Sequence, residues 1–309
     1  MKPLASMMAL AIAGLSALGS TGVSAQEAIG KPIPGGTGFQ PAVTEVMRDL
    51  VWLDDFLLVI ITAIVLFVTA LLGWCSYRYS AKRNPKPATF THNALIEVIW
   101  TAVPVVILVV IAIPSLRLLF EQLEVPEPDL TIKATGNQWY WTYDYPTEEI
   151  EFDSYMIGSA ATEAPEGTFP EDHSPVYDWT LNEDTAKTLE AYGYQRDEFL
   201  YATDTRVVVP VDKVVHVLVT GSDVIHAWAI PSFGVKIDTI PGRVNETWFK
   251  AEQVGTYFGQ CSELCGLQHS YMPIVVEVVE QDAYDAWVSE QVAKRDGTPA
   301  TELAAAAAE

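Results

Sequence analysis

The chain has 309 residues, 50% of them hydrophobic, and a formal net charge of -22, which leaves room for one ordinary domain with appendages. Residues 1–120 hold only 6 acidic side chains against 8 basic ones, so 34 of the 40 acids and 10 of the 18 bases fall in residues 121–309. That acidic part argues against nucleic acid as a partner and favours a basic protein, although acidity also keeps a domain soluble.

Residues 1–25 have the pattern of a secretory signal peptide. Lys2 gives a positive start, residues 4–18 are apolar, and small residues precede Gln26. We expect cleavage there, and a short uncleaved membrane anchor is the alternative. An extracytoplasmic segment, residues 26–51, would follow, and its part rich in Gly and Pro, residues 29–41, is expected to be flexible or extended.

Two uncharged runs, residues 56–74 and 98–116, are each long enough to cross a bilayer as a helix. We predict membrane helices over residues 52–76 and 95–119, the second tolerating its two prolines because neighbouring groups satisfy the freed backbone. The loop between them, residues 77–94, contains four basic residues and no acid. Such a loop is expected in the cytoplasm, so both flanks of the hairpin should lie outside.

Glu97 lies at the cytoplasmic start of the second predicted membrane helix. Ionisable groups at membrane depth are costly, and they are therefore candidates for a function. A carboxylate near a helix N-terminus also stabilises the helix through its dipole. The residues alone leave both interpretations open.

Residues 120–280 have the periodicity of short strands, at 130–134, 214–219 and 274–279 among others. Glycine and proline separate these runs, which predicts an all-β domain, a sandwich or a barrel of the Greek-key kind. The pattern lapses in residues 155–196, which we interpret as an acidic surface insertion with a short helix near residues 183–192.

The end of the chain has a different pattern. Residues 281–296 have helical spacing, with Tyr284, Trp287 and Val288 on one face. Residues 297–309, rich in alanine, are expected to form a disordered tail.

An aromatic block over residues 136–145 alternates with polar residues. Alternation of this kind can simply mark the two faces of a strand. In an electron-transfer protein, an exposed indole of this block beside an acidic surface is also a plausible place for an electron donor to dock. Rings near a membrane interface are a third interpretation.

Cys261, Cys265, His269 and Met272 follow a Cys-x3-Cys-x3-His-x2-Met spacing in one expected loop between strands. Two nearby cysteines in an oxidising compartment can form a disulfide. A disulfide needs neither the histidine nor the methionine, so the combination favours a metal site. Thiolate, imidazole and thioether are the ligands that select copper.

A second histidine would complete the copper site, and His226, in a turn after a strand, is the best candidate. His216 lies inside an apolar run and His173 inside the acidic insertion. The extra thiolate has a physical use, because two bridging sulfurs can hold two copper ions that share one electron. A backbone carbonyl of the loop would supply the remaining ligand, and a site without an open position favours electron transfer.

These residues together resemble subunit II of bacterial aa3-type cytochrome c oxidases over about residues 39–287. The motifs that carry the resemblance lie at residues 138–141, 223–228, 240–243 and 259–273. The resemblance implies a two-helix membrane hairpin and a periplasmic, cupredoxin-like barrel with a dinuclear CuA centre. The implied ligands are His226, Cys261, the main-chain carbonyl of Glu263, Cys265, His269 and Met272.

The same resemblance implies roles for other residues. The side chain of Glu263 would help bind a magnesium ion shared with subunit I, and Trp139 would be where electrons enter from cytochrome c. Glu97 would stand at the mouth of a proton pathway that continues into subunit I. The implied docking surface for cytochrome c consists of Gln138, Asp144, Asp153, Asp204 and Asp223.

The function implied is that of the electron-accepting subunit of a proton-pumping terminal oxidase in the bacterial inner membrane, with both termini and the copper domain periplasmic. Haem a and CuB would belong to subunit I, where oxygen is reduced to water. The alternatives are a membrane-tethered copper carrier and, disfavoured by the complete ligand set, a quinol oxidase subunit II. Two departures from the family pattern are Asn137, where many members have histidine, and the long insertion.

Overall fold

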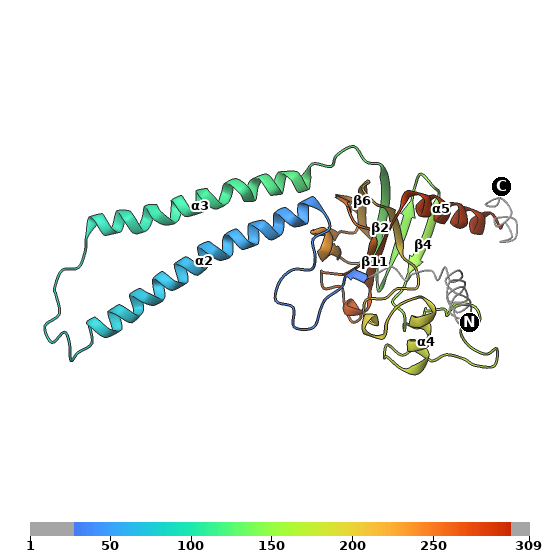
Figure 1. Ribbon diagram of the computed structural model, residues 1–309, viewed down its shortest axis with the longest axis horizontal. Coiled ribbons are helices and arrows are strands. Elements are labelled where there is room, and N and C mark those ends of the chain that lie inside the picture. The colour runs from blue at the N-terminus through green and yellow to red at the C-terminus, as the bar shows by residue number, and fades with distance from the viewer. Residues whose placement is uncertain (1–27, 298–309) are drawn as a thin grey trace, which may run out of the picture.

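The computed structural model describes residues 28–297 and consists of a long helical hairpin attached to a β domain (Figure 1). The expected signal peptide, residues 1–25, lies outside the described residues, as does the expected tail beyond residue 297. Strands occupy the domain and the two longest helices form the hairpin, which confirms the predicted combination of a membrane hairpin with a β-sheet domain.

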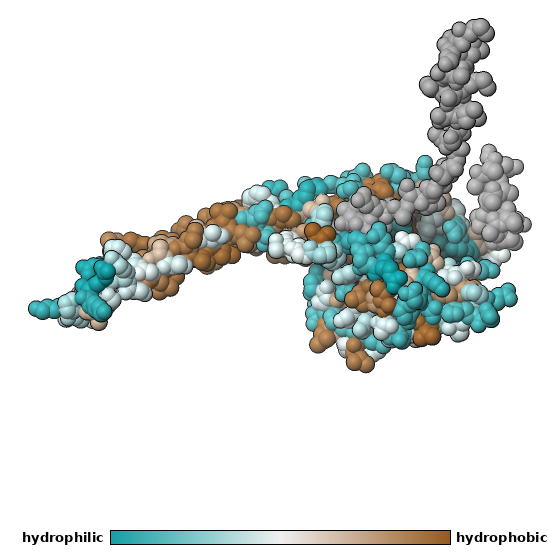
Figure 2. All heavy atoms as spheres, turned by 60° about the horizontal axis from the view of Figure 1, so that its bottom comes forward, coloured by the Kyte–Doolittle hydropathy of each residue, from teal (hydrophilic) through white to brown (hydrophobic). Residues whose placement is uncertain are grey.

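The hairpin consists of α2 (Glu45–Arg78) and α3 (Ala94–Leu123), both longer than predicted. Each begins at a side-chain cap, since Thr44 accepts a hydrogen bond from the amide of Met47, and Asn93 accepts from the amides of Leu95 and Ile96. Both helices are long and apolar enough to cross a membrane, and their most apolar stretches are not buried within the described structure. Figure 2 shows this apolar surface along the hairpin.

The strands of the domain form two larger sheets and a two-stranded ribbon. The first sheet has the order β1 (Ala28–Gly30), β10 (Gly255–Gln260), β11 (Pro273–Val279) and β5 (Val207–Pro210). The second has the order β4 (Ile150–Ser154), β3 (Tyr140–Tyr145), β2 (Leu130–Asn137), β6 (Val214–Gly221) and β9 (Asn245–Lys250). The ribbon pairs β7 (His226–Ile230) with β8 (Val235–Thr239).

The domain is all-β as predicted, but its sheets remain open and do not close into a barrel within the described residues. The edges of the two sheets are bridged by other elements. On one side, α5 (Gln281–Asp296) packs on β4 and β5, and on the other the ribbon contacts β10 through β7 and β9 through β8. Such bridging buries the core without requiring β4 to pair with β5.

Alternating burial on β2, β3 and β6 directs one face of the second sheet into the core. Trp141, Tyr143 and Tyr145 point inward from β3 and are at most 1% exposed. The helix α5 covers the same region, because Tyr284 is buried in this core and Trp287 and Val288 pack against it. The predicted C-terminal helix and its apolar face are therefore confirmed.

The segment 155–196 packs on the outer side of the first sheet. It contains the expected short helix, α4 (Glu183–Ala191). Leu189 and Tyr194 bury themselves against Phe258 of β10 and Val275 of β11, in a second small core. The acidic segment thus covers a sheet face that carries apolar side chains outward.

Candidate metal centre

The loop between β10 and β11 carries five of the six predicted ligands, all but His226. The two strands pair antiparallel up to Gln260 and Pro273, which stand opposite each other. This register brings the two ends of the loop together, so that Cys261 follows directly from one strand and Met272 leads directly into the other. Both side chains are buried, at 5% and 1% exposure.

His226, the first residue of β7, reaches the same place from a different part of the chain. Its side chain is fully buried and lies over Gly136 of β2. A Cβ atom at Gly136 would stand 2.8 Å from Cδ2 of the imidazole, closer than side chains pack. A glycine at this position therefore allows the ring to approach the loop.

The two thiols do not form the disulfide that the sequence left open. All three cysteines of the chain are free, and the Sγ atoms of Cys261 and Cys265 are 3.9 Å apart. A disulfide bond needs about 2.05 Å between the sulfurs. Each thiol instead faces an imidazole, with 3.9 Å from Cys261 Sγ to His226 Nδ1 and 3.5 Å from Cys265 Sγ to His269 Nδ1.

Two further donor atoms complete the cluster. The Sδ atom of Met272 lies 3.6 Å from Cys265 Sγ, and the carbonyl oxygen of Glu263 lies 3.4 Å from Cys261 Sγ. The ligand atoms of His226, Cys261 and Cys265 all lie within 4.8 Å of one another. Two thiols, two imidazoles, a thioether and a carbonyl thus converge, a donor set that fits copper.

Asp223 orients the buried histidine. Its carboxylate lies 2.8 Å from His226 Nε2 and also accepts a hydrogen bond from the amide of Gln138 at 2.7 Å. A carboxylate on one ring nitrogen fixes the tautomer and leaves the other nitrogen, here Nδ1, free to bind a metal.

The two thiols differ in acidity. For Cys261, burial opposes ionisation, but hydrogen bonding to His226 and to the loop backbone outweighs it and lowers the pKa to about 7. For Cys265, burial and the neighbouring charge of Cys261 raise the pKa to about 12. Cys261 therefore ionises more readily than Cys265, and a metal would bind both of them as thiolates.

Trp139 contacts the loop from the turn between β2 and β3. Its indole Nε1 donates to the carbonyl of Cys265 at 3.2 Å, and the side-chain amide of Gln138 donates to the same oxygen at 2.8 Å. Gly266 has a φ of +119°, and a Cβ there would lie 3.1 Å from the Trp139 ring. Of the aromatic block, residues 141, 143 and 145 mark a strand face, whereas Trp139 touches the cluster.

Comparisons with known proteins match this architecture. The profile for the cytochrome c oxidase subunit II transmembrane domain matches residues 32–118, and that for the periplasmic domain of the same subunit matches residues 130–176 and 180–279. Cytochrome c oxidase subunit 2 of Cereibacter sphaeroides is 53% identical over 277 residues, covering 88% of this chain and 87% of its own. The chain belongs to the cytochrome c oxidase subunit II family.

Two further proteins are similar to this chain. Cytochrome c oxidase subunit 2 of Metridium senile is 42% identical over 83% of this chain and 90% of its own. The crystal structure of the periplasmic domain of cytochrome oxidase subunit II of Bradyrhizobium japonicum is 46% identical, with a TM-score of 0.41, over 55% of this chain and 99% of that one. Membership of the subunit II family makes this a copper-binding membrane protein with a periplasmic domain.

The acidic residues predicted to dock cytochrome c in this subunit II chain come from several elements of the β domain. Asp223 lies beside the copper loop. Asp144 and Asp153 lie on β3 and β4, where Asp153 accepts a hydrogen bond from Thr142 at 2.7 Å. Asp204 is half-buried and accepts from the amide of Tyr155 at 2.9 Å, and burial raises its pKa to about 6.

Glu97 lies at the start of α3, at the far end of the hairpin from the β domain (Figure 1). Its carboxylate accepts a hydrogen bond from the backbone amide of Asn93 at 3.2 Å. This hydrogen bond caps the start of α3, as the helix-stabilising interpretation expects. The second carboxylate oxygen has no partner among the described residues.

Three contacts in the subunit II site were not expected. Trp141 Nε1 donates to the carbonyl of Met272 at 3.2 Å, and the ring of Trp179 lies 5.3 Å from that of Tyr271. Trp141 belongs to the aromatic block, so the sequence singled out the residue but not its contact. No sequence pattern indicated the contact between Trp179 and Tyr271. Asn137 joins the turn to the loop before Asp223, since its Oδ1 accepts from Ser222 at 2.5 Å.

The other two histidines considered as ligands lie elsewhere. His216 faces outward on β6, with Nε2 at 3.1 Å from Glu246. His173 lies in the insertion, 2.9 Å from Asp184.

Proposed function

We propose that this chain accepts electrons one at a time from a cytochrome c and passes them to haem a of subunit I in a haem-copper terminal oxidase. The observation that carries the proposal is the convergence of two thiols, two imidazoles, a thioether and a carbonyl on one buried point. The proposed ligands of a dinuclear CuA centre are His226, Cys261, the Glu263 carbonyl, Cys265, His269 and Met272.

The protein groups make this a rigid cage suited to electron transfer. Copper bound here would supply a one-electron carrier. Both thiols would hold the copper, and each imidazole approaches one thiol through Nδ1. The strand ends fix Cys261 and Met272, while Asp223 fixes His226, so the ligands need little rearrangement when the charge changes.

The path by which electrons arrive is proposed to run through Trp139. Its ring is partly exposed and hydrogen-bonds directly to the carbonyl of Cys265, which links the surface to a ligand. Around it, the acidic surface would attract a basic cytochrome c, with steering that weakens as salt increases. The proposed docking residues are Gln138, Asp144, Asp153, Asp204 and Asp223.

The interface with subunit I is proposed to lie at the outer face of the copper loop. Leu264 and Leu267 are 77% and 88% exposed, beside the exposed side chain of Glu263. Two large apolar side chains fully open to water next to a carboxylate indicate a covered surface in the assembly. A magnesium ion held partly by the Glu263 carboxylate would belong to that interface.

The arrangement in the membrane is also proposed. The basic loop, residues 77–94, would lie in the cytoplasm and both ends of the hairpin in the periplasm. Glu97 would then stand at the cytoplasmic surface, where protons enter a pathway leading into subunit I. Residues 120–280 would form the periplasmic copper domain, with residues 155–196 as its insertion.

Copper stoichiometry and electron paramagnetic resonance of the purified protein test the proposal. We expect two copper ions per chain and, in the oxidised form, one unpaired electron shared by both nuclei. Cys265→Ser should leave at most one copper ion per chain, with an unshared electron. Cys75→Ser, remote from the site, should change neither the copper content nor the spectrum. One copper ion per chain, or a site that takes only zinc, would contradict the dinuclear centre and favour a copper carrier.

A further inference from the structure

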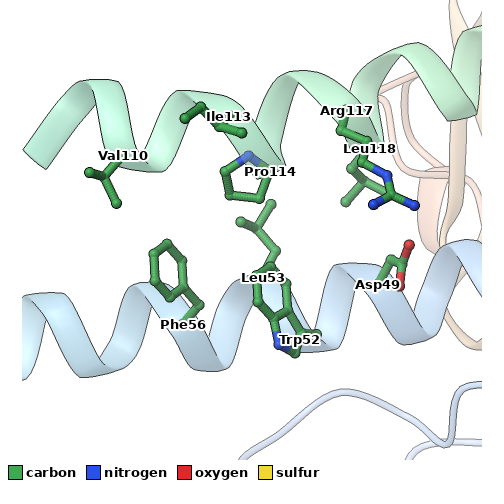
Figure 3. A pocket seen from close by; sticks show the side chains of 9 residues that line it. All are labelled: Asp49, Trp52, Leu53, Phe56, Val110, Ile113, Pro114, Arg117 and Leu118. Carbon is green, nitrogen blue, oxygen red and sulfur yellow. The ribbon is translucent and has the colours of Figure 1, made fainter.

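A cavity of 580 Å³ opens between α2 and α3 at the end of the hairpin nearest the β domain (Figure 3). Its volume lies in the range of about 300–1,000 Å³ that is common for small-molecule sites. The residues from α2 include Asp49, Trp52 and Phe56, and those from α3 include Val110, Pro114 and Arg117. Their spacing of three and four residues places them on the facing sides of the two helices.

A proline lines the opening. Pro114 lies inside α3 and has no N–H to donate to the carbonyl of Val110, one turn earlier. A proline ring also clashes with that carbonyl and bends the helix. Both residues line the cavity, so the disturbed turn of α3 faces it.

The cavity has a charged end and an apolar end. Asp49 and Arg117 face each other across its domain-proximal end, whereas Phe56 and Val110 line the opposite end (Figure 3). Within residues 28–297, neither Asp49 nor Arg117 makes a side-chain hydrogen bond or ion pair. Asp49 precedes the uncharged run of α2 and Arg117 directly follows that of α3, which puts both charges at the level of the lipid head groups, where a charged lipid group can pair with each of them.

One ligand of known chemistry satisfies both charges. We propose that the cavity binds a zwitterionic phospholipid of the phosphatidylethanolamine type from the leaflet on the periplasmic side. Its phosphate binds the Arg117 guanidinium, which has the fork geometry that matches phosphate oxygens. Its ammonium group binds the Asp49 carboxylate, and an acyl chain lies against Phe56 and Val110.

The head-group selectivity follows from the pair of charges. A phosphatidylglycerol molecule offers the phosphate but no ammonium group, so it would leave Asp49 unpaired and add net negative charge beside it. Trp52 lies three residues after Asp49 on α2 and also lines the cavity. Aromatic rings of membrane proteins are common at the level of the lipid head groups. The site does not depend on the metal centre.

Photolabelling of the purified oxidase complex tests the site. The probe is phosphatidylethanolamine with a photoreactive group in one acyl chain, and labelled peptides are located by mass spectrometry. We expect label in residues 45–56 and 110–118. Unlabelled phosphatidylethanolamine should compete about tenfold better than phosphatidylglycerol, as expected for one charge-assisted hydrogen bond. Absence of label from both peptides, as when a helix of another subunit fills the cavity, or equal competition would overturn the proposal.

Charge variants assign the two ends of the head group. Asp49→Asn should remove the preference for phosphatidylethanolamine, and Arg117→Gln should reduce labelling by both lipids. Arg78→Gln, at the opposite end of α2, is the matched control and should label like the parent. Unchanged selectivity in Asp49→Asn would overturn the proposal. If Arg117→Gln does not assemble, the labelling and competition of the parent complex decide the question.

Discussion

The ring of Trp179, in the acidic insertion, lies 5.3 Å from the ring of Tyr271 and at 54° to it, and Tyr271 directly precedes the proposed ligand Met272. The amide of Trp179 donates to the carbonyl of Gly158 at 3.0 Å, so the insertion holds this indole in place. The insertion therefore contacts the ligand loop itself, and its distance from the ligands in sequence conceals that relationship.

Removing this contact should loosen the copper loop. We expect Trp179→Ala to lose copper to a chelator about 2- to 10-fold faster, as expected for one aromatic pair, and Trp179→Phe to restore most of the difference. Phe169→Ala is the control, because Phe169 stacks on His173 within the insertion and not on the loop. Equal copper loss from Trp179→Ala and the parent would show that the contact does not support the site.

Trp139→Ala should slow electron uptake from reduced cytochrome c severely while leaving copper bound. The indole donates to the carbonyl of Cys265 but supplies no ligand atom. Stopped-flow kinetics and copper analysis measure the two effects separately. Tyr140→Ala, which removes a ring stacked on Tyr155 and not on the loop, should leave electron uptake close to that of the parent. Unimpaired oxidation of cytochrome c by Trp139→Ala would rule out the assigned path.

Asp223→Asn should weaken copper binding by about 10- to 100-fold, the usual cost of removing a carboxylate that orients a ligand histidine. Competition with a chelator measures the change. Asp153→Asn removes the same charge from the acidic surface, but its partners are Thr142 and Tyr155, so copper binding should be unchanged. Both variants should weaken the salt-dependent association with cytochrome c, which separates docking from copper binding.

For Glu97, charge and helix capping can be tested separately. Glu97→Gln keeps an oxygen that can accept from the amide of Asn93 but removes the titratable carboxyl. We expect this variant to assemble normally and to reduce oxygen several-fold more slowly, with a matching loss of proton uptake in vesicles. Glu97→Ala should show the same slowing and should also lower the melting temperature, because it removes the oxygen that accepts from Asn93. Parent-like turnover in Glu97→Gln would leave only the capping role.

Asp204 should make the stability of the domain depend on pH. Its pKa in the folded state, about 6, lies above the ordinary 3.8, chiefly because burial disfavours the charge. The folded state therefore binds this proton more tightly than the unfolded state. The contribution of Asp204 to the free energy of unfolding is fully present below about pH 4 and is lost as the pH rises through 6.

Replacing Asp204 by Asn should remove that dependence and raise the free energy of unfolding at pH 7 by about 1–2 kcal/mol. Melting temperatures of the periplasmic domain at pH 5 and pH 7 provide the measurement. Asp144→Asn, on the partly exposed face of β3, is the control. A parent profile that does not weaken between pH 5 and pH 7, or a profile for Asp204→Asn that matches it, would contradict the expectation.

Much of this architecture could be predicted because its signals are local. Uncharged runs predict the membrane helices, alternation predicts β2 and β6, and the Cys-x3-Cys-x3-His-x2-Met spacing predicts a single loop with four donors. Contacts between distant segments left no such signal. The packing of Trp179 on Tyr271 and the bridging of open sheet edges by α5 depend on tertiary structure, which periodicity does not encode. From the sequence, Asp223 was expected only in the docking surface. Its contact with the imidazole of His226 is visible only in the folded structure.

The strand β1, expected only to be a flexible or extended lead-in, pairs in parallel with β10, the strand that leads into Cys261. Residues 28–30 precede the hairpin in the sequence and β10 follows it. One sheet therefore contains segments from before and after the two membrane helices. The sheet can be completed only if the chain crosses the membrane an even number of times. Failure of either helix to insert would leave β10 with an open edge next to the first thiol, so correct membrane topology becomes a condition for building the metal site.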